Sequence, residues 1–529
     1  MASDLQLESL ADNLSIVTEW GKRAFKERLL NCNSNKSDIK RIQLPLFALK
    51  QEPAVVNVIR QSLEKVNPSL VDDCLHSTDS RIQESVTQIL WKKDSFGAFL
   101  NSSPTVLNAL ITWKTIVLPG FAVVMPLLAL IVPYFVLRYM NPISTNDYLE
   151  HVKTVLLQQV SIPSFLKARG SHDRIGFVLE SLFIGLTLAL FVSSLWNQIT
   201  TAQHLRHIWF DIESRGQALQ GMIVCASNIL TQCKSLPLRR QKALRYVIEE
   251  GEAALDAASN LVGLDGVSTF GAVWNDGAGL VRITAWLGHV DVLCGILQKN
   301  VCFPRIAAGP SLDIRGVYHP GLPTCVANDY TSSGHTILTG PNRGGKSTFC
   351  RAVGLALVTA QSWGFAWATS MTWRPFTAIL TALEPCGKLG IQSTFEGEIE
   401  FAKDVLTAAR AHAHAPAAAS PAAEKGSIFV MMDEIFHSTN ASDGVAASTV
   451  FLEQLYAEKN VTSVISTHYR HLAEHFKDTA AAYQMVAHSK PDMTLTYTYK
   501  AELGISDKSS VMEILIERGL APARRAVEA

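Results

Sequence analysis

The chain has little charge and no excess of either sign. Only 18% of its 529 residues are charged, and 47 lysines and arginines balance 47 aspartates and glutamates. Without a net positive field, any contact with nucleic acid must come from a local patch. One basic cluster is present, and a solvated helix face explains it better than phosphate contacts do: Lys234, Arg239, Arg240, Lys242 and Arg245.

Two further features are missing. None of the nine cysteines has CxxC spacing, so we expect neither a zinc site nor a disulfide framework. We expect reduced thiols in a cytosol-like compartment instead. The N-terminus, MASDLQLESLADNL, is acidic and amphipathic. It lacks the pattern of a secretory signal peptide.

Apolar residues are abundant instead, at 48% of the sequence, and two uncharged runs concentrate them. Thr115–Leu137 has 23 residues without a charge, enough to cross a hydrocarbon core about 30 Å thick. Its three prolines, seven residues apart, are tolerated better in membrane helices than in soluble ones. The second run is Ser181–Gln203. Together they predict a two-pass membrane hairpin; a pair of buried core helices is the alternative.

The segment TGPNRGGKST, residues 339–348, contains the full phosphate-binding loop pattern. An apolar strand pattern, His335–Thr339, precedes it and an apolar helix pattern, Phe349–Ala360, follows it. Strand, glycine-rich loop and helix N-terminus together form an anion site. We expect Lys346 to reach the β- and γ-phosphates of ATP and Ser347 to ligand Mg²⁺. The predicted nucleotide-binding residues are Gly340, Pro341, Asn342, Arg343, Gly344, Gly345, Lys346, Ser347 and Thr348.

Two later strand patterns end in residues that suit phosphate chemistry. Ser427–Met432 reads as a buried parallel strand ending in Asp433 and Glu434. Asp433 would complete the Mg²⁺ site, and Glu434 would act as the general base for the attacking water. His468, after the strand pattern Val461–Ile465, would sense the γ-phosphate. The sequence therefore predicts an ATPase with Glu434, His468 and Lys346 as catalytic residues.

These motifs resemble the ATPase domain of MutS-type DNA mismatch repair proteins, a branch of the ABC ATPases. The resemblance is strong over about residues 285–515. Besides the phosphate loop, it is carried by Ser393-Thr394-Phe395 followed by Glu398, by Met432–Gly444 and by Ser466–Leu472. Arg343 stands where the family usually has methionine, and Phe436-His437-Ser438 where it has Gly-Arg-Gly. Cys325 replaces an aromatic residue that stacks on adenine, for which Tyr330 or Tyr318 are candidate substitutes.

The resemblance implies a homodimer of head-to-tail ATPase domains. Each nucleotide would be bound between one subunit's phosphate loop and residues of the other, here Ser393, Asp443 and Gly444. In repair proteins of this family, helical levers end in DNA clamps and an N-terminal Phe-x-Glu wedge reads the mismatch. Phe25-Lys-Glu27 and Phe451-Leu-Glu453 fit that tripeptide by chance rather than by context. The predicted membrane hairpin occupies the place of the clamp.

Three functional classes follow. The first is a membrane-anchored MutS-type ATPase with a DNA or mismatch-repair role, and DNA binding is inherited from the resemblance alone. The second is an ABC-type ATPase that moves membrane helices or a protein partner without nucleic acid. The third, a nucleotide-gated structural dimer, is disfavoured by the intact set Lys346, Asp433, Glu434 and His468.

The predicted fold class is α/β, with a P-loop ABC-type ATPase domain at the C-terminus and a lever-like helical region before it, interrupted by two transmembrane helices. The expected regions are an N-terminal helical region (1–110), the hairpin (111–204), a helical lever (205–305) and the ATPase domain (306–529). Two spans keep both ends on one side of the membrane, which we expect to be cytosolic or nucleoplasmic because ATP is there. The basic residues of the connecting loop do not cleanly support that orientation.

Overall fold

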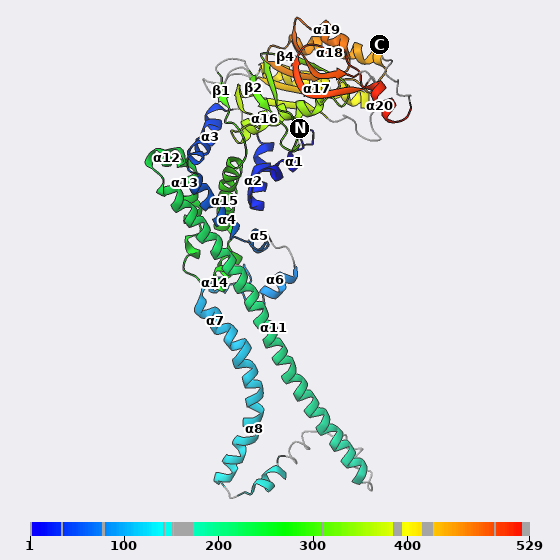
Figure 1. Ribbon diagram of the computed structural model, residues 1–529. Helices are drawn as coiled ribbons and strands as arrows, with labels where there is room; N and C mark the ends of the chain where they lie inside the picture. The colour runs from blue at the N-terminus through cyan, green and yellow to red at the C-terminus, as the bar shows by residue number, and fades with distance from the viewer. Residues whose placement is uncertain are drawn as a thin grey trace. The chain divides into compact units, whose positions relative to one another are not determined.

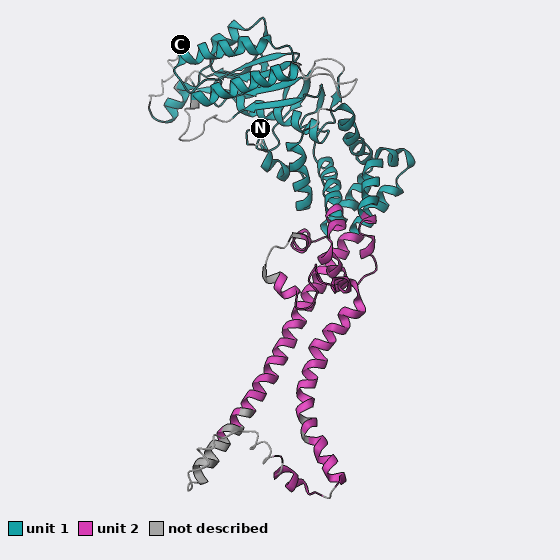
Figure 2. Cartoon of the chain, turned by 180° about the vertical axis from the view of Figure 1, so that it is seen from behind, with its two compact units in different colours: residues 1–65, 225–254, 283–529 teal, residues 66–224, 255–282 magenta. Residues whose placement is uncertain are grey.

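The computed structural model describes residues 3–32, 35–76, 80–140, 143–150, 152, 173–307, 312–383, 394–414, 427–490 and 494–520. The chain divides into two compact units, coloured separately in Figure 2. Unit 1 comprises residues 1–65, 225–254 and 283–529, and unit 2 comprises residues 66–224 and 255–282. Each unit therefore gathers segments that are far apart in the sequence, whereas the regions expected from the sequence are contiguous.

A six-stranded sheet forms the centre of unit 1, with the strand order β10-β9-β4-β8-β7-β6. The pairs among β9, β4, β8, β7 and β6 are parallel, and β10 pairs with β9 antiparallel. The inner strands are nearly continuous apolar runs, as expected for strands covered on both faces. The strands are β4 (His335–Thr339), β6 (Ala378–Ala382), β7 (Ile428–Met432), β8 (Val461–Ser466), β9 (Ala480–Ser489) and β10 (Leu495–Leu503).

Helices cover this sheet. Three of them share a buried apolar core with β7 and β8: α17 (Thr394–His414), α18 (Ala441–Ala457) and α19 (Arg470–His475). Figure 1 shows α16 (Lys346–Ser362) on the opposite side of the sheet from α18 and α19. This confirms the mixed α/β fold, and the predicted strand before the phosphate loop coincides with β4.

A second, four-stranded sheet in unit 1 has the order β1-β5-β2-β3. Its strands are β1 (Arg305–Ile306), β2 (Leu312–Val317), β3 (Asn328–Ser332) and β5 (Ser370–Trp373). Strand β3 alternates buried and solvent-facing residues, the pattern of a strand with one face on the core. That alternation turns Tyr330 into the interior, where it is fully buried.

The remaining helices of unit 1 pack through buried aromatic and polar contacts. Phe25 stacks on Trp363, with ring centroids 5.9 Å apart. The Asp291 carboxylate accepts hydrogen bonds from the Val17 and Thr18 N–H groups and the Thr18 hydroxyl, which fixes the start of α2. These helices are α1 (Leu7–Leu10), η1 (Ala11–Asn13), α2 (Glu19–Leu30), α3 (Lys36–Lys50), α4 (Pro53–Glu64), α12 (Leu238–Ala243) and α20 (Val511–Glu517).

Unit 2 is helical. It contains α5 (Pro68–His76), α6 (Ser80–Val86), η2 (Ala98–Ser102), α7 (Pro104–Thr112), the π-helical turn η3 (Trp113–Val117), α8 (Leu118–Met140), η4 (Ser259–Leu261) and α14 (Gly266–Asn275). Three helices include residues of both units: α11 (Asp173–Ser235), α13 (Arg245–Asp256) and α15 (Ala278–Leu297). Within unit 2, α8 and the part of α11 drawn in magenta extend away from the short helices (Figure 2).

Two helical segments in the described part of the chain have the length and apolar composition of a membrane span. In Pro104–Pro126, which overlaps the first predicted run, 11% of the apolar window is buried, and in Ala278–Leu297 78% is buried. The second segment is therefore a core helix. The predicted run Ser181–Gln203 lies within α11, and several of its side chains fall outside the described residues.

Candidate nucleotide-binding site

The phosphate loop joins the C-terminal end of β4 to the N-terminus of α16, the strand–loop–helix order predicted from the sequence. Gly345 has φ 95°, and a Cβ atom there would lie 3.3 Å from the Tyr499 ring. At Gly340, a Cβ would lie 2.9 Å from the Met485 side chain. Glycine is therefore required at both positions by backbone conformation and by space. The loop ends at the N-terminus of α16, where the helix dipole stabilises anions.

Lys346 is the first residue of α16 and is only 4% exposed. Its ammonium group donates to the carbonyl oxygens of Gly340 at 3.0 Å and Pro341 at 3.4 Å, and lies 3.7 Å from a Glu434 carboxylate oxygen. A buried ammonium requires such oxygen partners. The lysine is thus held inside the loop and directed toward the acidic end of β7.

Asp433 and Glu434 follow directly after β7, as expected. The Ser466 hydroxyl, at the end of the neighbouring strand β8, donates to an Asp433 carboxylate oxygen and accepts from the Glu434 N–H at 3.0 Å. The two acids are therefore fixed by the adjacent parallel strand. Ser347 lies in the first turn of α16 and lines the same cavity as Glu434. A hydroxyl and carboxylates are oxygen ligands of the kind that Mg²⁺ prefers, so this set fits the predicted metal.

His468 follows β8 in the sequence and is solvent-exposed. Its ring lies against Tyr469, with centroids 4.0 Å apart. Partial burial lowers the pKa of His468, the Glu434 carboxylate opposes this shift, and the Lys346 ammonium adds to it. All three predicted catalytic side chains therefore lie within one another's electrostatic reach.

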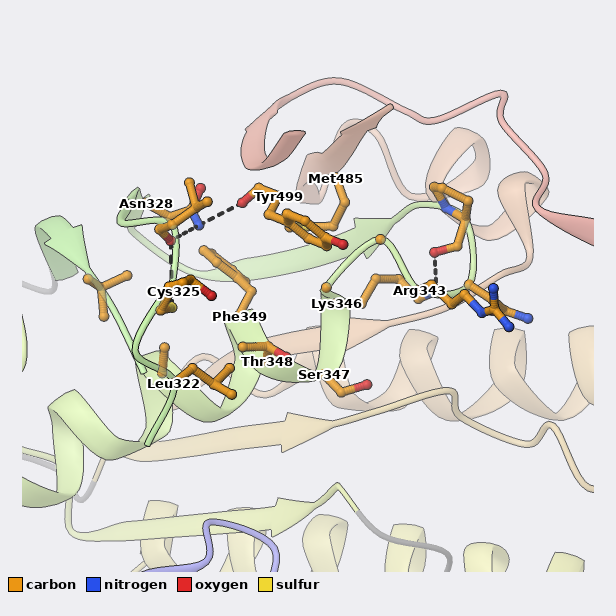
Figure 3. Close-up of a pocket in the computed structure, with 18 of the residues that line it drawn as sticks. Leu322, Cys325, Asn328, Arg343, Lys346, Ser347, Thr348, Phe349, Met485 and Tyr499 are labelled. Carbon is orange, nitrogen blue, oxygen red and sulfur yellow. Dashed lines mark hydrogen bonds between the residues drawn. The ribbon is translucent and has the colours of Figure 1, made fainter. Parts of the chain in front are cut away.

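A cavity of about 530 Å³ opens beside the loop (Figure 3). Its walls include the predicted nucleotide-binding residues 341–348 together with Leu322, Cys325, Asn328, Met485 and Tyr499. Cys325 stands at the position where the resemblance to MutS-type proteins predicted an aromatic residue. Neither suggested substitute lines this cavity: Tyr330 is buried with its hydroxyl 3.0 Å from the Thr336 hydroxyl, and Tyr318 donates to the Asn300 carbonyl.

Besides the buried Phe349, the cavity wall includes the exposed aromatic ring of Tyr499 on β10, which the sequence analysis missed. Tyr499 sits where the pairing between β9 and β10 is irregular and has φ 55°, unusual for a residue other than glycine. Asn328 holds this bulge by donating to the Tyr499 carbonyl at 3.0 Å and accepting from the Ala501 N–H at 2.7 Å. Figure 3 shows the Tyr499 ring over the loop that carries Lys346. No local sequence signal identifies it, because 153 residues separate Tyr499 from Lys346.

Arg343, which stands in the phosphate loop where the resemblance predicts methionine, has φ 67° and its side chain turns outward (Figure 3). Its guanidinium lies 2.5 Å from a Glu517 carboxylate oxygen of α20, and both side chains are about half exposed. An ion pair with that exposure contributes at most about 1 kcal/mol. Arg343 therefore links the loop to α20.

The residues expected to act across a subunit interface are placed differently from one another. Ser393 lies outside the described residues, which resume at Thr394, the first residue of α17. Asp443 is exposed in the first turn of α18, with its N–H bonded to the Asn440 side chain. Gly444 is buried. A Cβ there would come within 2.5 Å of both the Phe436 carbonyl oxygen and the Tyr469 hydroxyl, so the position has no room for a side chain.

The two Phe-x-Glu tripeptides are part of the protein core. Phe25 is fully buried in α2 and Phe451 is buried in α18. In the basic cluster, three cations have carboxylate partners within the protein, namely Lys234 with Glu252, Arg240 with Glu52 and Arg245 with Glu249. These pairs agree with the interpretation of a solvated helix face.

The cysteines and histidines of the described residues form no cluster of three or more metal-ligating side chains. The eight cysteines that the structure describes are all free, and Cys386 lies outside it. Burial raises the thiol pKa to about 11 in five of them, Cys32, Cys74, Cys225, Cys233 and Cys302, and raises it further in Cys294 and Cys350. Protonated thiols of this kind are poor metal ligands and poor nucleophiles.

Comparison with known proteins identifies the same region. Residues 336–523 match the family described as MutS domain V. The chain is 30% identical over 209 residues to the DNA mismatch repair protein MutS of Shouchella clausii, covering 37% of this chain and 22% of that protein. It is 30% identical over 245 residues to the protein of that name from Synechocystis sp., covering 42% and 26%, and 29% identical over 248 residues to that from Thermosynechococcus vestitus, covering 44% and 26%. The matched region spans about a quarter of these relatives.

Proposed function

We propose that residues 336–523, which are related to MutS domain V, make this chain an ATP-binding and ATP-hydrolysing protein. The observation that carries the proposal is the convergence on one cavity of a glycine-rich loop, a buried lysine and Glu434, with Asp433 next to Glu434 in the chain and bonded to Ser466 of the neighbouring strand. These groups come from β4, α16, β7 and β8. Such a set matches what phosphoryl transfer needs, namely positioning and charge stabilisation.

In this proposal the loop N–H groups and Lys346 bind the β- and γ-phosphates. A bound Mg²⁺ would be held by Ser347 and Asp433 and would offset phosphate charge. Glu434 accepts a proton from the water that attacks the γ-phosphorus, the bond to the β–γ bridging oxygen breaks, and ADP and phosphate are released. His468 donates a hydrogen bond to the γ-phosphate. Tyr499 stacks on the base in place of the aromatic that Cys325 replaces.

Two substitutions test this function. Glu434→Gln should retain ATP affinity but lower turnover by at least about 10²-fold, the scale of losing a general base. Lys346→Ala should instead weaken ATP binding itself. Glu453→Gln is a matched control, since its side chain is 59% exposed on α18. Wild-type turnover in the Glu434→Gln protein would remove Glu434 from this role.

The relationship to MutS also supports ATP-dependent pairing of two chains, with Ser393 and Asp443 reaching the partner's nucleotide. Asp443 is exposed, as such a role requires. Glu434→Gln protein should shift from monomer to dimer in sedimentation when ATP is added. A molar mass that stays monomeric at saturating ATP would exclude a composite site.

Membrane insertion through α8 and the first part of α11 is the third element of the proposal. It is supported by apolar side chains that stay exposed in the single chain rather than packing in its core. In α8, Phe121, Met125, Val132 and Phe135 are 50–62% exposed. In α11, the exposed apolar residues are Leu182, Leu186, Leu188, Leu190, Val192 and Trp196. Exposed apolar area on this scale marks a surface that is covered by a partner or by lipid.

The membrane proposal has a direct test. The full chain should float with lipid vesicles, resist alkaline carbonate extraction and be released only by detergent. A variant lacking residues 115–203 should lose this behaviour. A full chain that stays monodisperse without detergent would instead assign these helices to a soluble lever.

A DNA-repair role is proposed from the names of the relatives. The tested features of this chain add nothing to it, because Phe25 is buried and the basic cluster is largely ion-paired. Binding of duplex DNA, measured between about 50 and 200 mM salt, separates an ATPase that contacts DNA from one that acts without nucleic acid. A steep salt dependence would support DNA contact. Unmeasurable binding would leave an ATPase whose helices move within a membrane or against a protein.

A further inference from the structure

The loop directly after Glu434 has an unusual backbone. Glu434 has φ 51° and Phe436 has φ 50°, so two residues with side chains adopt the left-handed conformation within three positions. This conformation is unfavourable for residues with a side chain, because Cβ comes too close to the following carbonyl oxygen. A loop of this kind persists only where surrounding contacts fix it.

One contact is aromatic. Phe436 is buried between Phe395 of α17 and Phe451 of α18, with ring centroids 6.0 Å apart in both pairs and the rings edge to face. Edge-to-face aromatic pairs are stabilising beyond the burial of their area. The Phe436 side chain therefore offsets much of the strain at its own backbone and ties the loop to α17.

The other contact is polar and ends on one buried carboxylate. His437 Nδ1 lies 2.7 Å from the Glu434 carbonyl oxygen and 3.1 Å from Glu398 Oε1. A carbonyl oxygen only accepts, so Nδ1 carries the hydrogen and donates it. The Ser438 hydroxyl donates to Glu398 Oε2 at 2.9 Å. Burial raises the pKa of Glu398, and the bond from Ser438 counteracts that shift.

Both residues that follow Phe436 thus bind the same side chain of α17. We propose that His437 is a positioning residue for catalysis, which holds the Glu434 backbone in place by sharing one N–H between the Glu434 carbonyl and the Glu398 carboxylate. This rests on the proposed ATPase function and adds the element that aligns its general base. Helix α17 begins at Thr394, next to the segment expected at the subunit interface, so a shift of α17 would reach Glu434 through this contact.

The test separates alignment from folding by using pairs of variants in the full chain. His437→Ala removes the N–H, whereas His437→Asn places an amide N–H near the Nδ1 position. Glu398→Ala removes the acceptor, whereas Glu398→Gln keeps one. We expect His437→Ala and Glu398→Ala each to lower kcat about 10-fold or more, since small misplacements of a catalytic group are costly. ATP affinity should stay within about twofold of the wild-type value, since other residues bind the phosphates and the adenine base. The His437→Asn and Glu398→Gln variants should recover most of kcat.

The double variant should be no slower than the slower single variant, because both substitutions break one linkage. His471→Ala is the control, since that side chain is 84% exposed. The proposal is overturned if His437→Ala leaves kcat unchanged, if the two effects multiply, or if affinity and kcat fall together in the Ala and Asn variants alike. If His437→Ala does not fold, the Glu398 pair and His437→Asn give the answer. If the wild type hydrolyses ATP no faster than the Glu434→Gln variant, the ATPase proposal itself is refuted instead.

Discussion

Replacing Tyr499 should separate recognition of the base from recognition of the phosphates. The ring is 45% exposed, lines the cavity and lies against Gly345, so one face is open to a ligand. Stacking of an aromatic side chain on a base contributes about 1–3 kcal/mol. Tyr499→Ala should therefore raise the Kd for ATP about 5- to 150-fold. Tyr499→Phe should bind as the wild type does.

The assay is calorimetric titration of the detergent-solubilised protein with a non-hydrolysable ATP analogue and with inorganic tripolyphosphate. Tripolyphosphate has no base, so its Kd should be the same for wild type and Tyr499→Ala. Tyr499→Gly is a second probe, since glycine adopts φ 55° without strain and yet lacks the ring. It should lose ATP affinity as Tyr499→Ala does.

Asn328→Ala should weaken ATP binding less than Tyr499→Ala, because it frees the bulge without removing the ring. The reasoning is refuted if Tyr499→Ala weakens tripolyphosphate as much as the ATP analogue, or if ATP binding is unchanged. The first result would make Tyr499 a support of the loop. The second would place the base elsewhere in the cavity.

Two further predictions concern stability. Burial lowers the pKa of His289 to about 3 and of His335 to about 4, so folded protein keeps both neutral while the unfolded chain protonates near pH 6.5. The free energy of unfolding should be intact above about pH 6.5 and fall below it, with each histidine accounting for a loss of about 2 kcal/mol at pH 5. In urea unfolding, the His289→Phe protein should therefore lose about 2 kcal/mol less than the wild type between pH 7 and pH 5. Gly444→Ala should destabilise by about 1–3 kcal/mol, because its Cβ would meet the Phe436 carbonyl at 2.5 Å. Gly221→Ala, in α11 with open space around the Cβ, should be neutral or stabilising, and equal effects of the two substitutions would contradict this account.

The parts of the site that the sequence predicted well are those encoded within short stretches. The phosphate loop is a glycine spacing between a strand and a helix, and the predicted strand His335–Thr339 has the bounds of β4. The sequence also predicted that Asp433 and Glu434 follow directly after a buried strand, because the apolar run before them is typical of such a strand and ends at Met432. Neither tyrosine suggested as a substitute for Cys325 lines the cavity, because strand alternation in β3 buries Tyr330 and the Tyr318 hydroxyl donates to the Asn300 carbonyl.

By itself the sequence determined the place of the glycine-rich loop between a strand and a helix, the place of the two acids after β7 and the α/β character of residues 306–529, since each depends on neighbours a few positions away. Only the tertiary structure decided which side chains from distant segments complete the site. Tyr499 reaches the loop because β10 lies beyond β9 in the sheet and bulges there. His437 meets Glu398 because α17 packs over β7. Contacts of this kind follow from how strands and helices pack, which no local pattern of residues records.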